Sequence, residues 1–235
     1  SKLRPDLFSS VKEKDFTIPI AENLFASPAL KDTILNAIYQ IKPFENKKYR
    51  YSDLNFVLLQ KAVENITGES IDKYLMTNFF APLGANRTTF RPLLKINRSE
   101  IAPTENDEFL RKQIMIGYPH DELACFLGGV SGNAGLFSNS TDMAKMMLNK
   151  GVYGGKRILT ENSVKIFTQT KSSNSRRGLG FDKPDMQNTK KSPTCEEAPE
   201  CVYGHTGYTG TAFWVDPEND LIFIFLSNRV YAHRR

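Results

Sequence analysis

The chain has 235 residues, of which 40% are hydrophobic and 24% charged, a balance typical of a globular protein with one substantial core. No apolar run approaches the roughly 18 residues that a membrane helix needs, and the opening residues carry no signal-peptide pattern. We therefore expect no transmembrane segment. The net charge of +5 and the pI near 9.0 come from scattered lysines and arginines, so we also expect no nucleic-acid partner.

The first half of the chain predicts helices. Ser27 and Pro28 form a helix start, and the apolar spacing that follows predicts an amphipathic helix to residue 41. A second helix is predicted over 52–66, ended by Gly68, with one apolar stripe made of Leu54, Leu58, Ala62, Val63 and Ile66. Further helices are predicted over 69–80, over 141–149 and, after a capping threonine, over 161–169.

The last third of the chain predicts loops and then strands. Residues 170–201 are rich in Ser, Lys, Asn, Pro and Glu, which favours long loops around a short strand at 176–182. Two apolar runs then flank the turn 216–220, and they predict a strand pair that is buried on both faces. A hairpin alone is marginally stable in water, so we expect further strands from elsewhere in the protein.

Three cysteines give little chemical information. Cys125 stands in an apolar stretch and is expected to be a small buried side chain. Cys195 and Cys201 bracket a polar loop, where a disulfide is possible if the protein is exported. No histidine stands at ligand spacing from them, so no metal and no cofactor are predicted.

Tyr51, Ser52 and Asp53 form the first candidate site, at the start of the predicted helix 52–66. The unpaired N–H groups and the positive dipole end of that helix favour an anionic phenolate. To act as a base near neutrality, the pKa of Tyr51 must fall from about 10 to about 7, which costs roughly 4 kcal/mol and requires a nearby cation. The simpler interpretation is that Ser52 caps the helix and Tyr51 packs beneath it.

The stretch from His205 to Thr209 forms the second candidate site. Gly207 stands in a predicted buried strand, where a glycine often marks the approach of a ligand to the backbone. Thr206 and Thr209 offer hydroxyl groups beside His205. Backbone N–H groups beside a cationic side chain can bind a carboxylate or stabilise a developing oxyanion. The simpler interpretation is a glycine-rich strand start with a capping histidine.

In this order, the motifs resemble the class C β-lactamase and penicillin-binding-protein superfamily of serine hydrolases. "YSD" with the helix after it is similar to the family's Tyr-x-Asn region, and "HTGYTGTAFWVDPENDLIFIFLSNR" is similar to its Lys-Thr-Gly or His-x-Gly strand. "GGVSGNAGLFSNSTDMAKMMLN" and "RRGLGFD" resemble segments between the two. The region around "IAPTENDEFLRKQIMIGYPHDELACFLGG" most resembles the β-lactamase-related domain that Bacteroidetes proteins carry behind a family 3 glycoside hydrolase of the N-acetylglucosaminidase type.

The resemblance implies an α/β (α+β) fold of the β-lactamase/transpeptidase type, with an antiparallel sheet flanked by helices and a mainly helical region. Residues 1–235 would form one partial domain: a mainly helical region over 27–170, a loop-rich region with a short strand over 171–201, and a sheet hairpin over 202–231. The N-terminal strands, the nucleophile helix and the C-terminal helix would lie outside this chain.

The implied chemistry is acyl transfer at the serine of a Ser-x-x-Lys motif, on an ester, amide or β-lactam. Tyr51 would be the general base, and Asp53 stands where the family usually has asparagine, so it cannot donate an amide N–H to a substrate carbonyl. His205 would replace the third-motif lysine, and its titration near pH 6.5 would make the binding of anionic substrates pH-dependent. The Tyr208 N–H would be an oxyanion donor, and the remaining substrate-binding residues would be Ser52, Thr206, Gly207 and Thr209.

Two Ser-x-x-Lys sequences occur, Ser9–Lys12 and Ser70–Lys73, and both are chance matches. The first has no apolar run to bury, and the second follows Tyr51 instead of preceding it. We therefore expect the nucleophile in an N-terminal segment of the same protein, and no turnover by this chain alone. By resemblance, the substrate is a small molecule or peptidoglycan-like, and the location is periplasmic or at the cell envelope.

Three alternatives stand beside this interpretation. The acidic clusters at 104–108 and 120–122 could form a glycosidase carboxylate pair, although the chain lacks the repeated strand–helix units of glycosidase barrels. The glycines at 129, 132 and 135 imitate a phosphate loop, but no strand precedes them and no Lys-Ser/Thr follows. The domain could also be a non-catalytic binding or structural module appended to a glycoside hydrolase. Two departures from the related sequences favour a loss of catalytic residues: Asp53 stands where asparagine is usual, and Asn133 stands where histidine is frequent.

Overall fold

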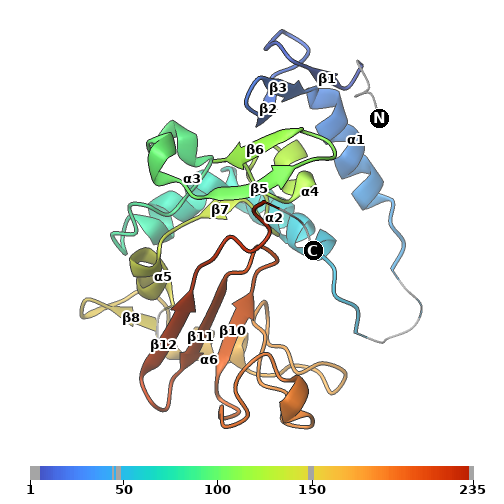
Figure 1. Ribbon diagram of the computed structural model, residues 1–235. Helices are drawn as coiled ribbons and strands as arrows, with labels where there is room; N and C mark the ends of the chain where they lie inside the picture. Colours follow the sequence, from blue (N-terminus) through green and yellow to red (C-terminus); the bar gives the residue numbers. More distant parts are fainter. Residues whose placement is uncertain (1–5, 44, 46–48, 148–150, 233–235) are drawn as a thin grey trace. The chain divides into compact units, whose positions relative to one another are not determined.

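The computed structural model describes residues 6–43, 45, 49–147 and 151–232, and its chain divides into two compact units (Figure 1). Unit 1 takes its described residues from Ser1–Thr77, Arg87–Phe137 and Asn228–Arg235. Unit 2 takes its residues from Asn78–Asn86 and Ser138–Ser227. Both units are built from segments that are distant in sequence, and each is described by itself below.

The described part of unit 1 contains three small antiparallel sheets. The first has the strand order β1 (Phe8–Ser9), β3 (Leu24–Ala26), β2 (Ile18–Ala21). The second is the hairpin of β5 (Pro103–Asp107) and β6 (Gln113–Ile116), and the third pairs β4 (Thr89–Phe90) with β7 (Leu136–Phe137). The sequence pattern did not predict any of these three sheets.

The predicted helices of the first half are present. Helix α1 (Pro28–Tyr39) begins with Pro28 at its first turn, and the Ser27 hydroxyl accepts a hydrogen bond from the Ala29 N–H at 3.2 Å. Helix α2 (Leu54–Thr67) ends at Gly68, which adopts the left-handed conformation with φ 71°. Helix α3 (Ile71–Leu75) continues into the π-helical turn η1 (Met76–Phe80), and shorter elements follow: η2 (Pro92–Leu94), η3 (Arg98–Glu100) and α4 (Glu122–Phe126).

The predicted apolar stripe of α2 is wrong for Leu58, Ala62 and Ile66, which are exposed, whereas Leu54 packs against the buried residues Ile38, Val57 and Leu127. Ile66 is 84% exposed and Leu58 is 41% exposed, whereas Val57 and Gln60 are the buried residues of this helix. The helix therefore presents Leu54, Val57 and Gln60 to the core of unit 1, and the polar Gln60 finds hydrogen-bond partners there that the spacing of apolar residues cannot reveal.

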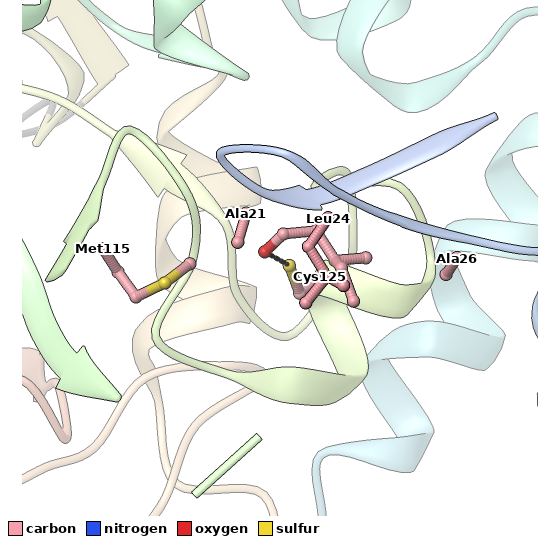
Figure 2. Close-up of a cluster of buried hydrophobic side chains, with 6 residues drawn as sticks. Ala21, Leu24, Ala26, Met115 and Cys125 are labelled. Carbon is pink, nitrogen blue, oxygen red and sulfur yellow. Dashed lines mark hydrogen bonds between the residues drawn. The ribbon is translucent and has the colours of Figure 1, made fainter. Parts of the chain in front are cut away.

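Among the described residues of unit 1, two clusters of buried apolar side chains join its elements. The first joins β2 and β3 to β6 and α4, and Figure 2 shows its members Ala21, Leu24, Ala26, Met115 and Cys125. In the same view, the Cys125 thiol donates to the Ile20 carbonyl at 3.1 Å. The second joins α1 to α2 through Ile38, Val57 and Leu127. Cys125 is thus the buried side chain that its apolar surroundings predicted.

Unit 2 contains the sheet with strand order β10 (Tyr203–Thr206), β11 (Ala212–Asp216), β12 (Leu221–Phe225), which is antiparallel throughout (Figure 1). Its other elements are α5 (Ser140–Met146), the pair β8 (Val152–Tyr153) and β9 (Lys156–Arg157), α6 (Glu161–Thr168) and η5 (Thr189–Lys191). The predicted helix 161–169 is confirmed as α6, with the Thr160 hydroxyl accepting from the Ser163 N–H at 3.0 Å. The predicted helix 141–149 corresponds to α5, although 148 and 149 lie outside the described residues.

Three predictions about the strands of unit 2 are wrong. The apolar run from 205 to 215 is not one strand, because residues 207–210 form a turn between β10 and β11. Residues 176–182 are irregular with bends, and only Asp182 among them forms a bridge, to Gly204 on β10. Strand β12 is only partly buried, and on one face only, through Ile222 and Ile224; the alternate residues Leu221, Phe223 and Phe225 are each more than half exposed. The hairpin around the turn 216–220 is confirmed.

Candidate active site

Tyr51 stands just before α2 and is 57% exposed. The Ser52 hydroxyl accepts a hydrogen bond from the Leu54 N–H at 3.3 Å, and the Asp53 carbonyl accepts from the Phe56 N–H at 3.1 Å. Asp53, although at the cap position, makes no side-chain capping bond. The helix start is therefore capped by Ser52, as the simpler interpretation predicted, while the exposed Tyr51 ring does not pack beneath it.

Gln60 fixes α2 against the glycine-rich loop of residues 129–135. Its side-chain oxygen accepts from the Gly132 N–H at 2.9 Å, and its nitrogen donates to the Val130 carbonyl at 3.4 Å. A Cβ on Gly132 would lie 2.1 Å from the Phe56 carbonyl oxygen, so only glycine allows this approach of the loop to the helix. The glycines that imitate a phosphate loop thus have a packing role.

A polar network ties the same loop to α4. The Asp121 carboxylate accepts from the Ala124 N–H at 2.7 Å, which caps α4, and from the Asn133 amide at 3.3 Å. The Ser131 hydroxyl donates to the Asn133 oxygen at 2.6 Å. Asn133, noted in the sequence as a departure from related proteins, therefore supports the loop structurally.

In the acidic cluster at 104–108, Glu105 and Asp107 are buried around Arg111, whereas Glu108 is exposed. Glu105 and Asp107 are at most 1% exposed, and the Arg111 guanidinium donates to Glu105 at 3.1 Å and to Asp107 at 2.5 Å. Burial would raise the pKa of Asp107, but the Arg111 hydrogen bond and the N–H groups of Leu110 and Phe109 lower that pKa to about 2. Glu105 and Asp107 are therefore buried in ion pairs with Arg111, which argues against a glycosidase pair that includes either of them.

The two Ser-x-x-Lys sequences lie in unsuitable places for a nucleophile. Ser9 belongs to the short strand β1, and Ser70 is an exposed residue at the start of α3, a helix of five residues with no buried member. Neither serine starts a buried helix, which agrees with their interpretation as chance matches.

In unit 2, the second candidate site lies where β10 ends and turns. His205 and Thr206 are the last residues of β10; Gly207, Tyr208 and Thr209 belong to the turn, and Tyr208 is 58% exposed. The Gly207 N–H donates to the Thr211 carbonyl at 2.7 Å, and a Cβ on Gly207 would lie 2.3 Å from the Thr211 hydroxyl oxygen. The close approach at Gly207 is therefore to Thr211.

A charged cluster that no sequence motif had indicated lies beside His205. Asp182 is 4% exposed, and its two carboxylate oxygens accept hydrogen bonds from Arg176 at 2.7 and 2.9 Å and from Arg177 at 2.9 Å. The other arm of Arg177 lies 2.8 Å from His205 Nε2. The only signal in the sequence is the adjacency of two arginines and an aspartate in "RRGLGFD", a stretch predicted instead as a strand.

Unit 2 also contains a cavity of about 760 Å³, lined by α6, by the start of β10 and by loop residues, among them Lys183, Glu200, Cys201, Tyr203 and Glu218. Burial raises the pKa of Tyr203 to about 12, and burial together with Glu218 raises the pKa of Cys201. The thiol and the phenol therefore stay protonated at neutral pH and are poor nucleophiles. Cys195 and Cys201 are both free thiols, so the loop disulfide is not formed in this structure.

The predicted site residues thus fall into two groups. Tyr51, Ser52 and Asp53 belong to unit 1, whereas His205, Thr206, Gly207, Tyr208 and Thr209 belong to unit 2. Within unit 1, α2 and the glycine-rich loop hold the first group; within unit 2, the β10–β11 turn holds the second.

The fold is that of the penicillin-binding-protein and β-lactamase-like proteins. The structure is similar to a penicillin-binding protein from Bacillus halodurans, with a TM-score of 0.60 at 16% identity over 90% of this chain and 61% of that one. It is also similar to an octameric penicillin-binding protein homologue from Pyrococcus abyssi, with a TM-score of 0.58 at 20% identity over 86% of this chain and 44% of that one. The predicted fold class is confirmed.

The sequence relationship is closer. The family described as Beta-lactamase matches residues 15–235, so the chain belongs to this family of serine hydrolases. A protein named "Putative D-alanyl-D-alanine carboxypeptidase" from Escherichia coli K12 is 37% identical over 201 residues, covering 79% of this chain and 46% of that protein. A protein of the same name from Salmonella schwarzengrund is 35% identical over 232 residues, covering 91% of this chain and 52% of that protein. The chain spans about half the length of these relatives.

In the described residues, no helix is long and apolar enough to cross a membrane. Across the same part of the chain, no group of three or more His, Cys, Asp or Glu residues is placed to hold a metal ion.

Proposed function

We propose that the chain is part of a serine hydrolase that forms an acyl-enzyme with a cell-wall peptide or a related ester, amide or β-lactam. The observation that carries the proposal is the family match over residues 15–235, together with 35–37% identity to proteins named as D-alanyl-D-alanine carboxypeptidases. A peptide that ends in a carboxylate is the substrate class that this name suggests. A periplasmic or cell-envelope location fits the same substrate.

Tyr51 is the proposed general base. Its exposure at the start of α2 leaves the phenol accessible, and the Gln60 anchor keeps the helix in a fixed place within unit 1. The end of β10 is the proposed acyl-binding edge, with Thr206 and Thr209 as hydroxyl donors and the Tyr208 N–H as an oxyanion donor. The nucleophile is proposed to come from a Ser-x-x-Lys motif elsewhere in the full-length polypeptide, so this chain alone is expected to be inactive.

The test compares this chain with a longer form that includes the upstream region of the same protein. Both are incubated with a fluorescent penicillin, which labels an active-site serine covalently. We expect labelling of the long form only. Labelling of this chain alone would overturn the proposed position of the nucleophile, and labelling of neither form would favour a non-catalytic binding module.

The role of Tyr51 is tested in the long form by Tyr51→Phe. Removal of the phenolic oxygen is expected to slow acylation by about 10²–10⁴-fold, the usual contribution of a general base. The matched control is Tyr49→Phe, because Tyr49 is also exposed, at 48%, and stands two residues away. Equal rates for the two variants would contradict the assignment of Tyr51.

A further inference from the structure

His205 is held between two groups that fix the position of its proton. Its Nε2 lies 2.8 Å from Nη1 of Arg177, and its Nδ1 lies 2.7 Å from the carbonyl oxygen of Thr206. A guanidinium carries only N–H donors, so the lone pair of Nε2 must accept this hydrogen bond. A carbonyl oxygen only accepts, so Nδ1 must carry the hydrogen. Both contacts select one species, the neutral imidazole protonated at Nδ1.

Arg177 is itself fixed against β10. Its Nη2 donates to Asp182 at 2.9 Å, and Asp182 is anchored to the strand by two backbone hydrogen bonds with Gly204, at 2.7 and 3.0 Å. The Asp182 carboxylate also accepts from Arg176, so two guanidinium groups share one carboxylate. Arg176 also lies 4.0 Å from the Asp185 carboxylate, so the two arginines and the two aspartates of this cluster balance in charge. Arg177, at 22% side-chain exposure, is the member that also contacts His205.

We propose that Arg177 is the specificity-determining cation at the end of β10, that it favours ligands bearing a carboxylate, and that His205 is a neutral positioning residue which orients it. The ligand class in this inference, a molecule with a carboxylate, rests on the proposed function. It replaces the expectation that a protonated His205 stands in for a lysine, because a charged imidazole would direct an N–H at the Arg177 guanidinium. The positive charge beside β10 then does not depend on the protonation of a histidine.

The positioning role is tested without any ligand. Long-range ¹H–¹⁵N correlation spectra of the ¹⁵N-labelled chain distinguish the two neutral tautomers and the imidazolium, and the chain has only three histidines to assign. His205 is expected to be protonated at Nδ1 and unprotonated at Nε2 at neutral pH. Arg177→Met is expected to abolish this single-tautomer pattern, whereas the matched variant Arg176→Met, which removes a guanidinium without a contact to His205, leaves it unchanged. A wild-type imidazolium or an Nε2-protonated tautomer would overturn the assignment.

The specificity role is tested with two probes, D-alanyl-D-alanine and its C-terminal amide, titrated into this chain while the backbone amides of residues 206–210 are followed. We expect the carboxylate form to bind more tightly, and Arg177→Met to weaken it by about tenfold or more while the amide is little affected. His205→Gln keeps an acceptor for Arg177 and should retain the preference. His205→Lys places a second cation against the guanidinium and should lose the preference for the carboxylate form.

The outcomes separate the two claims. Tighter binding of the carboxylate form by a folded His205→Lys variant would show that residue 205 is the cation, and would overturn the proposal. Absence of a carboxylate preference in the wild-type chain, including absence of binding, would overturn the specificity role of Arg177. The tautomer measurement judges the positioning role independently of substrate, and fluorescent penicillin labelling of the longer form judges the proposed hydrolase function.

Discussion

At the scale of single residues, Gly132 is the point where the glycine-rich loop of residues 129–135 approaches the backbone of α2. Gly132→Ala would place a Cβ 2.1 Å from the Phe56 carbonyl oxygen, so the loop or the helix must shift. Because the atom opposite is backbone and cannot rotate away, we expect a loss of about 3 kcal/mol in the free energy of unfolding, at the upper end of overpacking effects. The measurement is urea unfolding followed by circular dichroism.

Gly154 provides the comparison for this substitution. It has φ 55°, and no atom lies within 4 Å of the place where a Cβ would stand, so Gly154→Ala carries only the strain of the left-handed backbone, about 1 kcal/mol. Equal losses for the two variants would show that packing at Gly132 is not the cause.

Single residues also show what the sequence could and could not reveal about the site. Tyr51 and His205 stand in motifs of contiguous residues, so a local pattern was enough to single them out. The contact between Arg177 and His205 joins residues 28 positions apart, and Asp182 reaches Gly204 across a long loop-rich segment. A local pattern contains no information about such a contact, and the region around Arg177 was predicted only as a short strand.

At the scale of secondary-structure elements, predictability follows the locality of the signal. The helices α1, α2 and α6 were predicted because their caps and end glycine act within a few residues. The hairpin of β5 and β6 was missed because two of its inward positions are Glu105 and Asp107, buried by pairing with Arg111. Charged residues at buried positions erase the alternation of apolar and polar residues by which strands are identified.

The cap of α6 gives a prediction at this scale. Thr160→Ala removes the hydroxyl that accepts from the Ser163 N–H at 3.0 Å, and should lower stability by about 1 kcal/mol. Thr160→Ser keeps the oxygen and serves as the control, with stability close to wild type. Thermal unfolding and amide exchange at residues 161–163 measure the effect. Equal exchange rates in both variants would contradict the capping role.

At the scale of the whole molecule, the two compact units do not follow the sequence boundaries. Composition changes near residue 170, yet unit 2 already begins its long segment at Ser138 and also includes Asn78–Asn86. Unit 1 likewise gathers three separate segments. Contacts between distant segments define both units, so a change in composition along the chain could not locate their boundaries.

The pH dependence of global stability follows from the buried charges of unit 1. The pKa of Asp107 is about 2 in the folded protein, well below its unfolded value of about 3.9, so the folded state favours the ionised form. This contribution is fully present above about pH 5 and is lost as the pH falls through 2; it amounts to about 2.5 kcal/mol. The carboxyls of Glu64 and Asp72 also have lowered pKa values and add to the same acid-side loss.

The variant Asp107→Asn isolates the part of this pH-dependent stability that is due to Asp107. The variant leaves Arg111 without its closest carboxylate in a buried site, so we expect it to be about 3–5 kcal/mol less stable than wild type at pH 7. Because protonation removes the same charge from the wild type, the difference between the two proteins should shrink between pH 4 and pH 2. Urea unfolding across this range measures it, with Glu69→Gln at an exposed carboxylate as the control whose curve should run parallel to that of the wild type. A difference that stays constant down to pH 2 would show that the ionisation of Asp107 does not stabilise the fold.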